Sequence, residues 1–141
     1  MTESSSALVV EGGALRSVFS SGVLDGFLAQ SFWPFDFFIG VSAGASNLAF
    51  YKAGAAGQSL KIFLELAENR DFINYRRFLC GGHLLDLDWL FRSYFDKESL
   101  DMEKAFSLQQ PLYVCVTEVV SGDPAYIKAT SCNNVGSQKK T

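Results

Sequence analysis

The chain has 141 residues, of which 48% are hydrophobic and 19% are charged, proportions typical of a single packed globular domain. A formal net charge of −3 argues against nucleic-acid binding, because phosphate recognition needs clustered lysine and arginine. The three cysteines (Cys80, Cys115 and Cys132) form no CxxC pair, so neither a disulfide framework nor a metal site is expected.

The N-terminal segment predicts a cytoplasmic protein. Residues 1–6 have no positively charged region, and the apolar run at 7–10 is too short for the core of a signal peptide. No run approaches the ~20 apolar residues that would cross a bilayer. We expect residues 1–6 to be flexible and the domain to occupy residues 7–130, soluble or peripheral to a membrane.

The first half of the chain alternates predicted strands and helices. The apolar run at 7–10 predicts a buried strand that ends in glycines, and apolar residues every four positions predict a helix over 17–30, with Ser17 as its cap. A second strand is expected at 35–41, followed by an alanine-rich helix from Ala43 to Tyr51.

The second half predicts a helix at 58–69, a helical or turn-like segment at 84–95, and a hairpin. Residues 112–120 favour a strand, 121–124 a turn and 125–129 a returning strand. Residues 131–141 form a polar tail, expected to be frayed. The order of elements predicts an α/β fold with a mainly parallel sheet and an antiparallel edge.

The segment Gly40-Val41-Ser42-Ala43-Gly44 fits the G-x-S-x-G pattern and lies between a predicted strand and a predicted helix. A serine at such a turn has strained backbone and an exposed hydroxyl, and the following helix N-terminus favours negative charge nearby. The alternative is a small-residue turn without chemistry. Ser42 is therefore the candidate nucleophile, with Gly40 and Gly44 as the glycines of its turn.

A glycine turn, Glu11-Gly12-Gly13-Ala14-Leu15-Arg16, follows the first predicted strand. It lacks the lysine of a phosphate-binding P-loop and the third glycine of a dinucleotide fingerprint. Its backbone N–H groups could instead stabilise an oxyanion. Because ligands bind at the carboxyl ends of parallel strands, we expect this turn and Ser42 to face one cleft.

Residues 8–16, Gly22-Val23-Leu24-Asp25 and the Ser42 turn together resemble the start of a patatin-like phospholipase, closest to the bacterial branch. A weaker likeness extends over residues 7–129. The resemblance implies a three-layer α/β/α fold and hydrolysis of lipid acyl esters without a cofactor. It implies a Ser-Asp dyad with Ser42 as nucleophile, an acyl-enzyme intermediate, and an oxyanion hole at Gly12, Gly13 and Ala14. Arg16 matches the family's basic residue, which orients the turn or meets an anionic headgroup; a solvated surface arginine is the alternative.

Two departures from the family pattern stand out. Ala14 and Ser17 occupy positions where the family has glycine, and we expect Ala14 to keep its donor role if its φ is negative. The Asp-Gly-Gly motif that carries the family's aspartate is absent, so the domain looks truncated at its C-terminus. Asp86, Asp88 and Asp123 are more simply surface or turn residues than substitutes for it.

Three functional hypotheses stay open at this point. The first is lipid acyl-ester hydrolysis through Ser42, and the second is a catalytically impaired fragment that binds a lipid or a partner. The third is a carboxylesterase with His83, the only histidine, as its base. The aromatic run 32–35 either touches a membrane surface or plugs the core, and an exposed sheet edge favours self-association.

Overall fold

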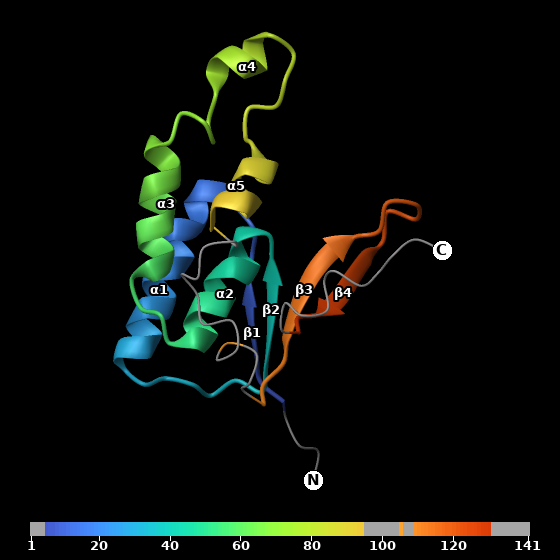
Figure 1. Cartoon of the computed structure of the whole chain (residues 1–141). Helices are drawn as coiled ribbons and strands as arrows, with labels where there is room; N and C mark the ends of the chain where they lie inside the picture. The colour runs from blue at the N-terminus through green and yellow to red at the C-terminus, as the bar shows by residue number, and fades with distance from the viewer. Residues whose placement is uncertain (1–4, 95–104, 106–108, 131–141) are drawn as a thin grey trace.

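The computed structural model describes residues 5–94, 105 and 109–130 of the chain (Figure 1). The elements are β1 (Ala7–Val10), a 3-10 helix η1 (Ala14–Ser17), α1 (Val18–Ala29), β2 (Phe37–Val41), α2 (Ala43–Ala53), α3 (Gln58–Glu68), α4 (Tyr75–Leu79), α5 (Leu87–Tyr94), β3 (Leu112–Thr117) and β4 (Pro124–Lys128). Within this part of the chain, no helix is long and apolar enough to cross a membrane. The predicted tail at 131–141 lies outside the described residues.

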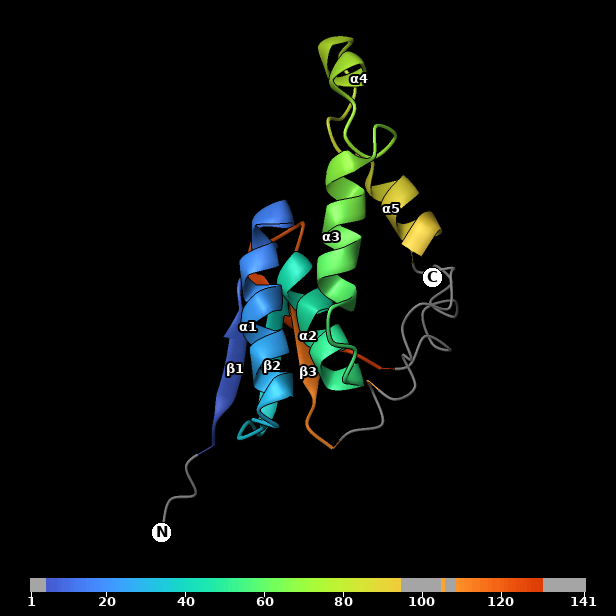
Figure 2. The ribbon, with the colours of Figure 1, turned by 90° about the vertical axis from the view of Figure 1, so that its left-hand side faces the viewer.

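The four described strands form one sheet in the order β1-β2-β3-β4, in which only the β3–β4 pair is antiparallel. Right-handed crossovers in a sequential strand order place their helices on the same side of a sheet. Accordingly α2 lies against β2 and β3, and α1 and α3 pack beside it (Figure 2). The predicted α/β fold with a mainly parallel sheet and an antiparallel hairpin edge is confirmed.

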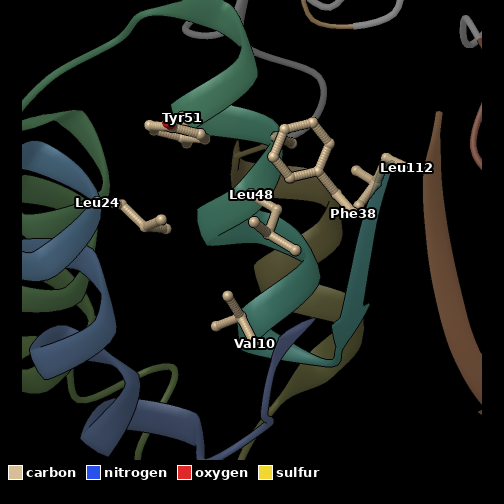
Figure 3. Packing of buried hydrophobic residues seen from close by; sticks show 7 residues of the cluster. Val10, Leu24, Phe38, Leu48, Tyr51 and Leu112 are labelled. Carbon is tan, nitrogen blue, oxygen red and sulfur yellow. The ribbon is translucent and has the colours of Figure 1, made fainter. Parts of the chain in front are cut away.

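The core lies between the sheet and α2 (Figure 3). Phe38 of β2 and Leu112 of β3 are register partners, so their side chains point to the same face, and both are buried. Leu48 and Tyr51 of α2 pack onto that face, and Leu24 of α1 closes the cluster. Each large apolar side chain buried in this way contributes about 1.5–3 kcal/mol relative to an exposed one.

The aromatic loop between α1 and β2 packs on this core. The Trp33 and Tyr51 rings stack with centroids 4.3 Å apart. The Tyr51 hydroxyl donates a hydrogen bond to the Phe32 carbonyl oxygen, and burial raises the pKa of Tyr51. Of the two interpretations of this run, the plug on the core is therefore the one that the contacts support.

Lys52 joins α2 to the start of β3. Its side chain is 3% exposed, and its Nζ donates a 2.5 Å hydrogen bond to the Gln110 carbonyl oxygen. The same ammonium lies 5.1 Å from the centre of the Phe38 ring, a cation–π contact. Burial lowers the pKa of Lys52, because desolvation disfavours the charged form.

Several predicted boundaries differ from the structure. The strand expected over 112–120 ends at Thr117, because the Glu118 N–H bonds back to the Asp123 carbonyl oxygen and the turn begins there. Ser17 precedes α1 without a side-chain capping bond, and the chain reaches this helix through η1. The short helix α4, which extends beyond the end of α3, was not predicted (Figure 1).

Candidate active site

Ser42 lies at a sharp turn between β2 and α2. Its backbone has φ 51° and ψ −124°, a conformation that side-chain-bearing residues rarely adopt, and the residue is exposed. Such strain costs on the order of 1–3 kcal/mol and persists only where the surroundings enforce it. The turn therefore presents the hydroxyl to solvent at the N-terminus of an 11-residue helix.

The two glycines of the G-x-S-x-G pattern are needed for close backbone packing. A Cβ on Gly40 would lie 2.4 Å from the Ala45 Cα, so the strand and the helix approach too closely for a side chain. A Cβ on Gly44 would lie 2.4 Å from the carbonyl oxygens of both Val10 and Glu11. Gly44 thus lets the first turn of α2 rest directly on the end of β1.

The glycine turn after β1 lies against the serine turn. Val10 and Gly40 are register partners in the parallel pair, so the chain leaves both strands at the same edge of the sheet. A Cβ on Gly12 would lie 3.1 Å from the Val41 carbonyl oxygen and 3.2 Å from the Ser42 Cβ. The structure therefore brings the two predicted turns into contact.

Ala14 of the glycine turn has a positive φ. Its φ is +48°, so the condition of a negative φ, under which Ala14 was expected to keep its donor role, is not met. Ala14 has the left-handed backbone that usually favours glycine. Gly13, in contrast, has the extended φ of 172° that any residue adopts. The turn retains its shape because η1 begins at once, with the Arg16 N–H donating to the Gly13 carbonyl oxygen at 3.0 Å.

Replacing Ala14 with glycine should raise the free energy of unfolding by about 0.5–1 kcal/mol. A left-handed alanine costs roughly 1–2 kcal/mol, partly offset by the roughly 0.5–1 kcal/mol that glycine loses in chain entropy. Urea unfolding of both proteins measures the difference. Ala29→Gly, at an exposed position in α1, is the matched control and should lose up to about 1 kcal/mol. Equal losses in both variants would contradict strain at Ala14.

Arg16 is exposed and lines a pocket next to the glycine turn. The pocket encloses about 160 Å³ and is bordered by Glu11, Gly12, Gly13, Arg16, Ser17, Phe19 and Ser20. A Cβ on Gly13 would lie 3.8 Å from the Arg16 Nε, so the guanidinium folds back towards the turn. This position of Arg16 is compatible with both of its expected roles, support of the turn and contact with an anionic group.

Comparison with known proteins decides the family. The sequence model of the patatin-like phospholipase family matches residues 8–110. The chain belongs to the patatin-like phospholipase family. It is also 37% identical over 130 residues to the uncharacterized protein YjjU of Escherichia coli strain K12; the aligned region covers 90% of this chain and 36% of YjjU. The chain thus spans about a third of that relative's length, and no solved structure matches it.

A serine nucleophile needs a general base, and the described residues offer none hydrogen-bonded to Ser42. Asp86 is paired with Arg77, whose Nη1 lies 3.0 Å from its Oδ2, and it also accepts the Trp89 N–H. Asp123 lies in the β3–β4 turn and His83 in the loop after α4, where its carbonyl oxygen accepts the Arg77 Nε–H. None of these side chains forms a hydrogen bond with the Ser42 hydroxyl.

One residue near this patatin-like site was missed by the sequence analysis. Asn47 of α2 is 1% exposed, and its Nδ2 donates a 2.8 Å hydrogen bond to the Ser17 carbonyl oxygen. The available signal was an asparagine within an alanine-rich helix that has few polar residues. Because its partner is a backbone atom on another element, only the structure identifies the contact.

Proposed function

We propose that the chain carries the nucleophile and oxyanion turn of a serine acyl-hydrolase that cleaves lipid acyl esters. The strained, exposed Ser42 carries this proposal, because glycine would adopt this backbone conformation without strain and yet a residue with a hydroxyl occupies it. The glycine turn in contact with it supports the same function. Family membership supports a lipid as the substrate.

The proposed chemistry is nucleophilic acyl transfer. The Ser42 Oγ attacks the ester carbonyl carbon, its proton passes to a base, and the carbonyl oxygen becomes an oxyanion. The N–H groups of Gly13 and Ala14, with that of Ala43 at the start of α2, are the proposed donors to that oxyanion. Ala14 stays in this proposal despite its positive φ, because alanine carries a backbone N–H in any conformation. Collapse expels the alcohol, which takes a proton, and water then hydrolyses the acyl-enzyme. The family's base is an aspartate, and we assign it to no residue of this chain.

Arg16 is the proposed contact for an anionic headgroup. Its side chain lies beside the glycine turn. When the ester of a phospholipid is bound at the oxyanion donors, the phosphate of the same lipid would be close to this side chain. A guanidinium is suited to a phosphate because it offers two parallel N–H donors. An uncharged acylglycerol would gain nothing from this contact.

A fluorophosphonate probe tests the function. It should label the wild-type protein covalently and leave Ser42→Ala unlabelled, because the probe reacts with a serine activated beside oxyanion donors. Intact-protein mass spectrometry gives the stoichiometry and peptide mapping the site. Labelling of both proteins to the same extent would discard Ser42. If neither protein reacts but both bind lipid vesicles, the binding-module hypothesis replaces the enzyme.

We also propose that the protein contacts a membrane surface and self-associates. Peripheral membrane contact is supported by the lipid nature of the proposed substrate, and self-association by exposed apolar residues at the sheet edges, such as Val9 of β1, which is 62% exposed. A cytoplasmic location, predicted from the N-terminal segment of the sequence, is likewise a proposal.

A further inference from the structure

A cluster of buried polar residues lies where α1, α2 and α3 meet. Its members are Ser17, Ser21, Asn47 and Ser59, each no more than 5% exposed. Asn47 is the centre of the cluster: its Nδ2 donates to the Ser17 carbonyl oxygen at 2.8 Å, and its Oδ1 accepts the Ser59 hydroxyl. The buried side-chain amide of Asn47 thus connects α2 to η1 and to α3.

The position of Asn47 on α2 matters for the candidate active site. Asn47 comes three residues after Gly44, so both lie on the same face of the helix. Gly44 rests on the carbonyl oxygens at the end of β1, before the glycine turn, and Asn47 bonds to Ser17, after it. The helix that begins after Ser42 is therefore attached to both ends of the segment that carries the glycine turn.

The attachment at Ser17 fixes an orientation that apolar packing alone would not. Ser17 is the last residue of η1, and the N–H of Arg16 ties this 3-10 helix back to Gly13. Movement of the Ser17 carbonyl would therefore tilt η1 and with it the N–H groups of Gly13 and Ala14. A hydrogen bond has a preferred direction, whereas an aliphatic side chain in the same space would allow η1 to slide.

We propose that Asn47 is a positioning residue that holds the glycine turn at the distance from Ser42 that acyl transfer requires. The inference rests on the proposed function of Ser42. Asn47 does not touch the substrate; it acts through the Ser17 carbonyl oxygen. Its loss should slow attack by Ser42, because displacement of catalytic groups by about 1 Å can cost roughly 100-fold in rate.

Two substitutions separate the hydrogen bond from packing. In Asn47→Asp, an ionised carboxylate cannot donate to the Ser17 carbonyl, but a protonated one can, and burial raises the pKa of a carboxyl group. We compare the fluorophosphonate labelling rate of Asn47→Asp with the wild-type rate at the same pH. This ratio should be low at pH 8 and recover at pH 5. Asn47→Leu has no donor at any pH, so its ratio should stay about 10- to 100-fold below one throughout.

Ser59→Ala is the matched control. It removes the hydrogen bond from α3 to Asn47 but leaves the bond to Ser17 in place, so its labelling rate should equal that of the wild type. Each variant is assayed where circular dichroism shows it to be folded. Wild-type rates in Asn47→Leu, a pH-independent deficit in Asn47→Asp, or an equal deficit in Ser59→Ala would each overturn the positioning role. Absence of wild-type labelling would instead overturn the proposed function, and the inference with it.

Discussion

Gly44→Ala should destabilise the protein by about 3 kcal/mol or more. The added Cβ would lie 2.4 Å from two backbone carbonyl oxygens, that of Val10 at the end of β1 and that of Glu11 in the glycine turn, which cannot move without shifting the backbone there. Overpacking of this kind typically costs 1–3 kcal/mol, and here the obstacle is backbone on both contacts. Chemical denaturation followed by circular dichroism measures the loss, which should appear as a lower midpoint at an unchanged slope.

Gly26→Ala is the matched control for the same chemical change. Gly26 is exposed in α1 with nothing within 4 Å of its ideal Cβ, so alanine should raise the free energy of unfolding by about 0.5–1 kcal/mol. The two substitutions thus have opposite expected signs. A Gly44→Ala protein as stable as the wild type would show that α2 does not rest on β1 as the structure describes.

The backbone arrangement of the candidate site could be predicted because it follows from strand direction. Two apolar runs, one before the glycine turn and one before Ser42, predicted two parallel strands. The turns that follow parallel strands lie at the same edge of the sheet. The helix after Ser42 was predicted from alanine content alone. In each case the pattern that predicts a single strand or helix lies within one short run of the chain.

The remaining features depend on contacts between distant segments. The positive φ of Ala14 could not be predicted from the sequence, because alanine itself prefers negative φ and only the surrounding turn enforces the exception. The partner of Asn47 lies 30 residues earlier in the chain, and that of Lys52 lies 58 residues later. The helix α4 has only five residues, too few for a periodic pattern to reveal.

Ser42→Gly should abolish covalent labelling and at the same time stabilise the fold relative to Ser42→Ala. Both variants lack the hydroxyl, so neither can attack an acyl or phosphonyl centre. They differ in backbone freedom: at φ 51° and ψ −124° alanine keeps the strain of the native serine, whereas glycine adopts this conformation at little cost. The expected gain for glycine over alanine is about 1 kcal/mol, after the entropy that glycine loses on folding.

The comparison between the two variants measures strain held at the nucleophile. Differential scanning calorimetry and urea unfolding of wild type, Ser42→Ala and Ser42→Gly give the three free energies of unfolding. Ser46→Gly, within α2 and at ordinary helical φ, controls for the intrinsic cost of glycine and should be less stable than Ser46→Ala by up to about 1 kcal/mol. If glycine were also less stable than alanine at Ser42, the turn would be unstrained, and the main support for a catalytic serine would be lost. The expected reversal of sign between positions 42 and 46 would show that the fold holds Ser42 in a conformation that its own backbone disfavours.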